Sequence, residues 1–351
     1  MNQSPDTLIA VNRDTVTEVH GDEGMVVNMS TFDYIELDRV GIAMWQALLD
    51  GGSANSALDI LLARFEVDRS TLETDLNEFI IQLTAVGLID AEPQPDRYEA
   101  KPTAAPTAID LYLDLLIRTV SGLTIRDNRK GMTYVSPFHL GHRIHGRDIP
   151  EEAFTMIGLL RLNNVRALAE RALVDAVPGD FIETGVWRGG ATILMRGILA
   201  AHQVTDRRVW VADSFEGLPT PDLARFPADD YWSPLAGWLN VSLEDVRANF
   251  DSLQLLDDQV VFLKGWFSES LPTAPIEQIA LLRLDGDLYE STMDSLTNLY
   301  PKVSPGGYVI IDDYNLDSCK LAVDEFREKN AITAPLQIID WAGVWWQVPS
   351  E

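Results

Sequence analysis

The sequence contains little that would support a disulfide, a membrane span or a secretion signal. Its single cysteine, Cys319, excludes an internal disulfide and fits a reducing compartment. Asp, Arg or Gly interrupts every apolar stretch before it reaches the length needed to span a bilayer. The N-terminus is polar and acidic and lacks the basic leader and apolar segment of a secretion signal. We therefore expect a cytoplasmic protein that has no membrane partner.

Basic residues are also scarce. The 351 residues include 27 Lys and Arg against 54 Asp and Glu, which gives a formal net charge of −27. A surface this acidic repels phosphate backbones and anionic lipid heads, so we expect no nucleic-acid partner. Cationic or neutral ligands are favoured instead. The alternative is that the charge serves only solubility.

A segment rich in proline and alanine divides the chain. Residues 93–108 lack apolar periodicity, and proline removes backbone donors and favours extended chain, so we interpret this segment as a linker. The sequence therefore predicts an N-terminal domain over residues 1–92 and a larger C-terminal domain over residues 109–351.

The N-terminal part has the pattern of short strands followed by helices. Turn residues flank two strand-like runs at 24–30 and 33–38, and apolar residues recur at helical spacing over 39–51, 54–67 and 68–89. These elements predict a small α+β domain of winged-helix type, a shape that often binds DNA. Residues 1–90, however, contain 16 Asp and Glu against four Arg, whereas a DNA-binding domain needs basic residues to neutralise phosphates.

The same part resembles PqqD-like domains, which bind the leader regions of ribosomally made precursor peptides. The resemblance covers about residues 15–92, and its features are Leu37-Asp38, Gly41, Trp45, "VD" before the last helix and "L…GL" at its end. It implies that a leader peptide binds as an extra strand at the sheet edge, with the third helix as the other wall of the groove. The alternative is a plain helical domain in which Trp45 and several leucines are only core.

The C-terminal part alternates strands and helices, which predicts an α/β fold with a doubly wound, mostly parallel sheet. The expected strands cover 179–186, 207–215, 259–267, 279–287 and 306–314, followed by a strand pair over 336–348. The expected helices include 150–177, 187–203 and 316–330. In such sheets ligands bind at the carboxyl ends of the strands, so the residues that follow these strands are the candidates for a site.

The turns after the first two strands suit a cofactor with a cationic amino acid portion. Glu183, Thr184 and Gly185 end the first strand, and glycines here let the backbone approach a ligand. The pattern is neither G-x-G-x-x-G nor a phosphate loop, and the carboxylate would repel a pyrophosphate. S-adenosylmethionine suits this turn. Asp213 ends the second strand, where it could accept hydrogen bonds from ribose hydroxyls or could cap a helix instead.

The turn after the third strand offers a place for the adenine. Gly265 and Trp266 lie there, and backbone groups and the indole could meet an adenine edge. Trp266 could equally be part of the core.

Four aspartates follow the fourth and fifth strands. Asp285 and Asp287 end one strand and Asp312 and Asp313 end the next, and carboxylates that converge in this way repel one another unless a cation lies between them. Oxygen-only ligands favour Mg²⁺, which would lower the pKa of a substrate oxygen beside a methyl donor. Asp287 or another of these acids could then take the proton. The alternative is that the acids cap loops and pair with Lys or Arg.

From about Leu111 to Gln347 the chain closely resembles the macrocin O-methyltransferase (TylF-like) family. The runs that carry this resemblance include "GDFIETGVWRGGATILMR", "VWVADSFEGLPTP", "LRLDGDLYEST" and "GGYVIIDDY". The resemblance implies a Rossmann-like class I methyltransferase sheet, mostly parallel with a C-terminal antiparallel strand. It also implies an enzyme that uses S-adenosylmethionine and Mg²⁺ to methylate hydroxyls of natural-product sugars and related groups.

The resemblance also implies roles for individual residues. By motif, the cofactor contacts would be Glu183, Gly185, Asp213 and Ser214, beside Thr184, Gly265 and Trp266 in the same turns. The metal ligands would be Asp285, Asp312 and Asp313, and the catalytic residues would be Asp287, as the base, and Asp285. Some relatives carry a histidine three positions after the first metal ligand, where this chain has Leu288.

Two further segments are candidates for the substrate side. Residues 124–150 depart from the family and contain His139, His142 and His145, which we expect to be lid residues or part of a solvated loop, with a metal cluster as the alternative. Residues 218–238 have the Pro, Gly and aromatic content of a lid over the acceptor site.

The function we expect is Mg²⁺-dependent O-methylation of a ribosomally made peptide by a homo-oligomer. The N-terminal domain would bind the leader, which raises the effective concentration of the peptide at the C-terminal active site. A hydroxyl acceptor needs a metal and a base, whereas a carboxylate is already ionised, so both acceptors stay open. The alternatives are methylation of a sugar hydroxyl on a small-molecule natural product, with the N-terminal domain serving dimerisation or stability, and a non-catalytic peptide-binding scaffold.

Overall fold

The computed structural model describes residues 9–12, 15–28, 33–90, 106–125, 140–230, 237 and 239–350. The chain divides into two compact units, Met1–Ala105 and Pro106–Glu351, and each unit has its own hydrophobic core. No helix in the described ranges is long and apolar enough to cross a membrane.

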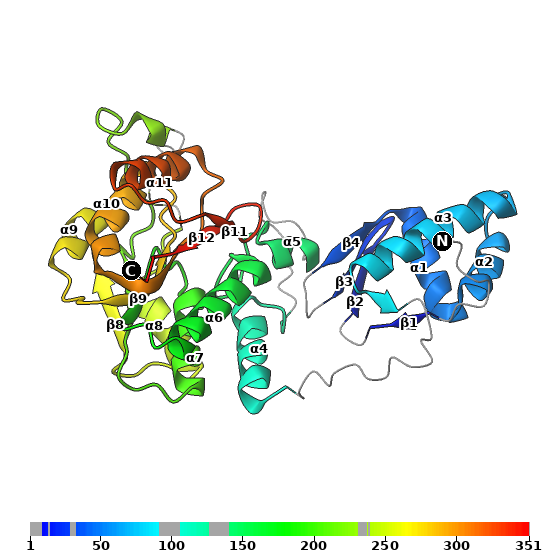
Figure 1. Ribbon diagram of the computed structural model, residues 1–351, viewed down its shortest axis with the longest axis horizontal. Helices are drawn as coiled ribbons and strands as arrows, with labels where there is room; N and C mark the ends of the chain where they lie inside the picture. The colour runs from blue at the N-terminus through cyan, green and yellow to red at the C-terminus, as the bar shows by residue number, and fades with distance from the viewer. Residues whose placement is uncertain are drawn as a thin grey trace. The chain divides into compact units, whose positions relative to one another are not determined.

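The described residues of the N-terminal unit form a three-stranded antiparallel sheet and three helices (Figure 1). The strands, in sheet order, are β2 (Thr15–His20), β3 (Glu23–Asn28) and β4 (Tyr34–Leu37). The helices are α1 (Arg39–Gly51), α2 (Ala54–Leu62) and α3 (Arg69–Ala85), and β1 (Ala10–Val11) pairs with β5 (Ile89–Asp90). The predicted small α+β fold is confirmed.

Local side-chain contacts explain where these elements begin and how they pack. The Asp38 carboxylate accepts the Gly41 N–H at 2.8 Å and so caps the start of α1. The Trp45 indole is buried in the core and donates its N–H to the Thr17 hydroxyl of β2 at 2.8 Å. The prediction missed β2, because the two apolar residues of this edge strand, Val16 and Val19, lie three positions apart instead of two and are themselves about 40% exposed.

The C-terminal unit is built around a seven-stranded sheet with the order β11-β12-β10-β9-β6-β7-β8. Its strands are β6 (Asp180–Thr184), β7 (Val209–Asp213), β8 (Val260–Lys264), β9 (Ile279–Leu284), β10 (Val303–Ile311), β11 (Gln337–Ile338) and β12 (Val344–Gln347). Neighbouring strands from β8 to β10 run parallel, whereas β12 runs antiparallel to β10 and to β11. The predicted mostly parallel α/β sheet with an antiparallel C-terminal strand is confirmed.

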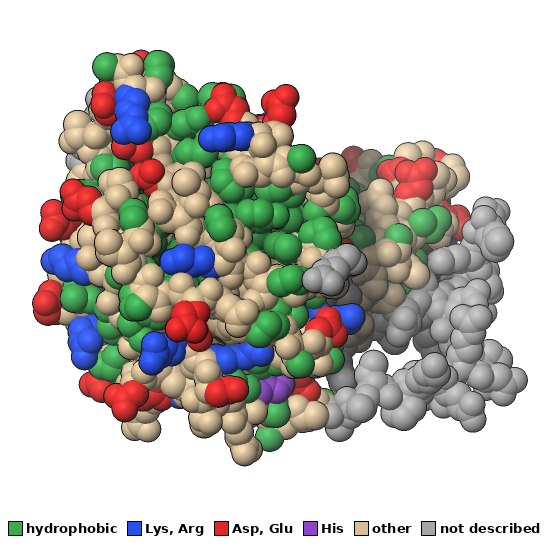
Figure 2. Space-filling model, turned by 60° about the vertical axis from the view of Figure 1, so that its left-hand side comes forward, with side chains coloured by type: hydrophobic (Ala, Val, Ile, Leu, Met, Phe, Trp, Pro, Cys, Tyr) green, Lys and Arg blue, Asp and Glu red, His purple; other side chains and the backbone are tan. Residues whose placement is uncertain are grey.

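Helices cover both faces of this sheet (Figure 1). The helices are α4 (Ala108–Val120), α5 (Leu140–His145), α6 (Gly158–Val174), α7 (Gly190–Ala201), α8 (Leu243–Ser252), α9 (Phe267–Ser270), α10 (Tyr289–Leu299) and α11 (Asp317–Lys329). Helices α6 and α7 pack on one face, and α10 and α11 lie on the other. On the face shown in Figure 2, acidic and basic side chains are interspersed around a group of hydrophobic ones.

One predicted helix boundary is wrong. The helix expected over 150–177 begins only at Gly158, whose φ of +74° places it in the left-handed region. This left-handed backbone prevents a right-handed helix from continuing through residue 158. A side chain here would also put its Cβ 2.3 Å from the backbone nitrogen of Gly146. This turn brings residues 146 and 155–157 to the edge of the site described next.

Candidate active site at the carboxyl ends of the strands

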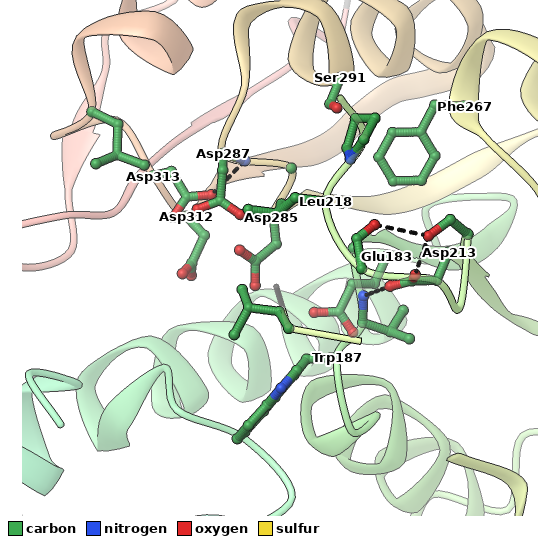
Figure 3. Close-up of a pocket in the computed structure, with 18 of the residues that line it drawn as sticks. Glu183, Trp187, Asp213, Leu218, Phe267, Asp285, Asp287, Ser291, Asp312 and Asp313 are labelled. Atoms are coloured by element: carbon green, nitrogen blue, oxygen red, sulfur yellow. Dashed lines mark hydrogen bonds between the residues drawn. The ribbon is translucent and has the colours of Figure 1, made fainter. Parts of the chain in front are cut away.

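The order in which the chain adds strands to the sheet reverses between β6 and β9. The chain passes from β6 to β7 and β8 on one side, and then to β9 and β10 on the other, which leaves a crevice beyond the carboxyl ends of β6 and β9. A cavity of about 610 Å³ opens there (Figure 3). The predicted site residues that line it are Glu183, Gly185, Asp213, Ser214, Gly265, Trp266, Asp285, Asp287, Asp312 and Asp313.

Thr184 is the predicted cofactor residue that does not line the cavity. Its side chain is buried, and its hydroxyl accepts a hydrogen bond from Ser295 of α10 at 3.2 Å. Its carbonyl oxygen accepts the Asp285 N–H at 2.9 Å, so Thr184 joins the ends of β6 and β9 from behind the site.

Glu183 presents an unsatisfied carboxylate oxygen at the end of β6. It is 2% exposed and lines the cavity, and its Oε1 accepts a hydrogen bond from Arg283 while no described group pairs with Oε2. Burial raises the pKa of Glu183 to about 8; Arg283 opposes this rise, and Asp285 and Asp312 add to it. A ligand ammonium at Oε2 would satisfy this oxygen and stabilise its charge, as the amino acid portion of S-adenosylmethionine requires.

Gly185 lets the turn after β6 touch the turn after β9. It has a φ of +83°, and a Cβ here would lie 1.6 Å from the carbonyl oxygen of Asp285. A side chain at this position is therefore excluded by geometry, in addition to the conformational strain. Trp187, two residues later, also adopts a left-handed backbone with φ +48° and lines the cavity. Such conformations cluster at functional sites.

The Asp213 carboxylate fastens two of these turns together. It accepts the Val186 N–H at 2.8 Å and the Phe215 N–H at 2.7 Å, so it joins the turn after β6 to the end of β7 (Figure 3). Burial raises its pKa, whereas these backbone donors lower it. A contact to ribose, the predicted role, would use the lone pairs that remain.

The four aspartates converge at the ends of β9 and β10 (Figure 3). Carboxylate oxygens of Asp285, Asp312 and Asp313 lie within 4.8 Å of one another. Asp287, whose backbone is left-handed with φ +57°, donates its N–H to Asp313 at 3.2 Å. Burial and the neighbouring charges raise the pKa of Asp287 to about 8, and they raise the pKa of Asp313 well above its ordinary value.

Two buried arginines, which the sequence analysis missed, lie among these acids. Arg283 on β9 bonds to Glu183, Asp285 and Asp312, and Arg161 on α6 bonds to Asp312. The alternative that the acids pair with arginine therefore holds for Asp285 and Asp312. The signal was present in the sequence, because an arginine within the apolar strand "IALLRL" is as costly as the carboxylates that follow it.

The arginines do not balance the negative charge. Arg161 also pairs with Asp340, at 3.1 Å. The cluster thus contains six carboxyl groups, namely Glu183, Asp285, Asp287, Asp312, Asp313 and Asp340, and two guanidiniums, which leaves an excess of four negative charges if all are ionised. No basic side chain among the described residues pairs with Asp287 or Asp313. The donor set and its charge therefore fit a hard divalent cation such as Mg²⁺.

The loop after β7 forms another wall. Leu218, Pro219, Thr220 and Asp222 line the cavity, whereas residues 231–236 and 238 of the predicted lid lie outside the described residues. Farther along this loop the buried Asp229 accepts the N–H groups of Tyr289 at 2.7 Å and Glu290 at 3.2 Å. Asp229 thus caps α10, whose own N-cap residue, Leu288, makes no side-chain cap.

The predicted histidine segment contributes little to the cavity. His142 and His145 lie in α5 and do not line it, although Gly146 next to them does, and His139 lies outside the described residues. Within the described ranges, the group of His, Cys, Asp or Glu close enough to hold a metal is Asp285, Asp312 and Asp313.

Comparisons with known proteins agree with this architecture. The family profile described as macrocin-O-methyltransferase (TylF) matches residues 111–348, and the profile described as coenzyme PQQ synthesis protein D (PqqD) matches residues 23–89. The demethyldecarbamoylnovobiocin O-methyltransferase of Streptomyces niveus is 53% identical over 253 residues, which cover 70% of this chain and 97% of that protein.

A second relative and a solved structure match the same part of the chain. The 8-demethyl-8-(2,3-dimethoxy-alpha-L-rhamnosyl)-tetracenomycin-C 4'-O-methyltransferase of Streptomyces olivaceus is 50% identical over 243 residues, 68% of this chain and 93% of that protein. The structure of the O-methyltransferase NovP superposes with a TM-score of 0.65 at 52% identity and covers 69% of this chain and 99% of that chain.

Proposed function

The chain belongs to the macrocin O-methyltransferase (TylF) family and is an O-methyltransferase, and we propose that it transfers a methyl group from S-adenosylmethionine to a hydroxyl group of a natural product in an Mg²⁺-dependent reaction. The observation that carries this proposal is the position of the Asp285, Asp312 and Asp313 carboxylates, which lie within 4.8 Å of one another on the wall of the cavity that Glu183 also lines. The proposal divides the cavity into a cofactor side and an acceptor side.

On the cofactor side, the chain's residues bind and orient the methyl donor. The free Oε2 of Glu183 accepts the ammonium group, Gly185 lines the cavity beside it, and Gly265 and Trp266 border the space for the adenine. These residues lie at the ends of β6 and β8, whereas the aspartates lie at the ends of β9 and β10. The acceptor therefore enters from the aspartate side.

On the acceptor side, Asp285, Asp312 and Asp313 would hold the metal. When bound, Mg²⁺ supplies Lewis acidity that lowers the pKa of an acceptor hydroxyl. Asp287 would take the hydroxyl proton. S-adenosylmethionine, when bound, would supply the methyl group to the acceptor oxygen and leave as a neutral thioether. Asp287 lines the cavity and donates its backbone N–H to Asp313, which places it next to these ligands as the candidate base.

The acceptor class follows from the chemistry and from the relatives. A metal and a base are needed for a hydroxyl and not for a carboxylate, which is already ionised at neutral pH. A relative that is 50% identical is named for methylation at a 4' position of a rhamnosyl-bearing tetracenomycin. We therefore propose that the acceptor is a hydroxyl group of a glycosylated small molecule.

The test is methyl transfer from labelled S-adenosylmethionine to a panel of glycosylated aglycones. We expect transfer to at least one acceptor, loss of transfer in EDTA, and recovery when Mg²⁺ is added back. Transfer that is unaffected by EDTA would disprove the metal requirement, and transfer to peptides alone would disprove the small-molecule acceptor.

The N-terminal unit supports a second candidate, in which the acceptor is part of a ribosomally made peptide. The PqqD profile matches residues 23–89, and β4 is an edge strand of the three-stranded sheet in the part of the chain that the structure describes. At the opposite end of this sheet, the Thr15 hydroxyl of β2 donates to the Leu88 carbonyl at 3.0 Å. An extended leader peptide could add to the β4 edge as a fourth strand.

Peptide binding by the full chain separates the two candidates. Fluorescent synthetic precursor peptides encoded beside this gene should bind the full chain and not a chain shortened to residues 106–351, and the peptide candidate predicts that they are methylated. Absence of binding by every such peptide would exclude the peptide acceptor and leave the N-terminal unit a role in dimerisation or stability.

A further inference from the structure

Arg161 is almost fully buried at the edge of the active site, and none of the roles above uses it. It lies in the first turn of α6 and is 5% exposed. Its Nη1 donates to Asp312, its Nε donates to Asp340 at 3.1 Å, and its Nη2 donates to the Gly146 carbonyl at 3.4 Å. One guanidinium therefore joins a candidate metal ligand after β10 to the turn between β11 and β12.

Two glycines lie close against this side chain. Gly146 has a φ of +60°, and a Cβ there would lie 2.4 Å from the Arg161 Nη2. A Cβ at Gly343 would lie 3.2 Å from the Arg161 Cδ. The guanidinium is thus held by packing on two sides as well as by its hydrogen bonds, which fixes its orientation.

The partner turn forms a wall of the cavity. Asp340 accepts the N–H groups of Ala342 at 2.9 Å and Gly343 at 2.8 Å, which closes the turn around Trp341. Trp341 is 45% exposed and lines the cavity, and its indole N–H donates to the His145 carbonyl at 2.7 Å. The Arg161 guanidinium lies 6.0 Å from the centre of the indole ring.

We propose that Arg161 is a positioning residue that holds Asp312 in its orientation toward the metal and, through Asp340, fixes the Trp341 turn as a wall of the acceptor side. The inference rests on the proposed Mg²⁺-dependent function. Partners that orient a metal ligand from behind typically change metal affinity by about 10- to 100-fold when they are removed. A lysine keeps the positive charge but, as a point charge without the planar fork, cannot bridge both aspartates with the same geometry.

The proposal is tested with Arg161→Lys in the full chain, because this change keeps the charge and removes the bridge. We expect the Kd for Mn²⁺, measured by electron paramagnetic resonance of the free ion, to rise about tenfold or more. We also expect faster amide hydrogen exchange in the segment 336–347. Binding of S-adenosylhomocysteine, measured by calorimetry, should stay within about twofold of wild type, which shows that the fold is intact.

Two further variants separate the effect of the Arg161–Asp312 contact from that of the Arg161–Asp340 contact. Asp340→Ala leaves the Arg161–Asp312 pair in place, so it should speed exchange over 336–347 and leave the Kd for Mn²⁺ within about twofold. If Arg161→Lys does not fold, Asp340→Ala still tests whether the Arg161–Asp340 contact holds the turn. Arg166→Lys is the matched control, because Arg166 lies on the same helix and pairs at the surface with Asp110 and Asp114, and it should change neither readout.

Three results would overturn the proposal or its premise. An unchanged Kd for Mn²⁺ in Arg161→Lys disproves the positioning of Asp312. Unchanged exchange over 336–347 in Asp340→Ala disproves the role of the bridge in holding the turn. Absence of Mn²⁺ binding by the wild-type chain disproves the proposed metal dependence, and with it the claim that Arg161 orients Asp312 toward a metal.

Discussion

Replacing Arg283 with methionine should destabilise the C-terminal unit strongly, and more so at alkaline pH. The Arg283 side chain is fully buried and bonds to Glu183, Asp285 and Asp312. Removing one partner of a buried ion pair leaves an uncompensated buried charge and costs about 3–5 kcal/mol. Arg283 is the partner of three carboxylates, so we expect a loss of at least about 3 kcal/mol in the free energy of unfolding at pH 8.

The pH dependence follows from the raised pKa of Glu183. A carboxyl whose pKa is higher in the folded than in the unfolded state binds more protons when folded, so stability falls as pH rises between the two values. For Glu183 that window extends from its ordinary pKa of 4.5 to about 8. Arg283 opposes this rise, and without it the pKa of Glu183 moves still higher. The cost of Arg283→Met should therefore be smaller at pH 5.5 than at pH 8.

Urea and thermal unfolding at the two pH values measure this effect. A unit of this size loses about 2–4 °C in Tm per kcal/mol, so the variant should lose at least about 6 °C at pH 8. The control is Arg166→Met, because each ion pair of this partly exposed arginine contributes about 0.2–1 kcal/mol. An equal cost at both pH values, or a cost no larger than the control's, would refute the electrostatic account of this cluster.

Three further substitutions test other parts of the site. Asp287→Asn should lower kcat by about 10²- to 10⁴-fold with unchanged binding of S-adenosylhomocysteine, and an unchanged kcat would exclude Asp287 as the base. Gly185→Ala places a Cβ 1.6 Å from the Asp285 carbonyl oxygen and should abolish binding of S-adenosylhomocysteine; near-wild-type calorimetry would contradict the close approach. Asp229→Ala removes the cap of α10 and should cost about 0.5–2 kcal/mol in urea unfolding, whereas no loss would mean that the cap is dispensable.

The fold could be predicted from the sequence because most strands of the large sheet are recognisable from their own apolar residues. β9 is buried along its whole length and reads as an apolar run, and the acids that follow it lie at the carboxyl end that the parallel sheet brings next to β10. Ten of the predicted site residues line the cavity for this reason. Their roles as ligands, base and cofactor contacts stay predictions, and so does the peptide acceptor.

The features that were missed depend on residues far apart in the chain. Arg283 finds its partners on β6 and after β9 and β10, and Asp229 caps a helix that begins 60 residues later. Thr184 lies in the expected turn, but the alternation of the strand directs its side chain toward Ser295 instead of the cavity. The sequence marks Arg283 as an arginine in an apolar strand, but no local pattern names its partners, because these meet only when the strands are ordered in the sheet.

The central claim is that the strand-end aspartates hold a divalent cation beside the methyl donor. Anomalous diffraction from crystals grown with Mn²⁺ and S-adenosylhomocysteine tests it most directly. The account predicts one strong anomalous peak among the carboxylates of Asp285, Asp312 and Asp313, and loss of that peak in Asp312→Ala. A cavity with bound S-adenosylhomocysteine and no anomalous peak among these carboxylates would contradict it.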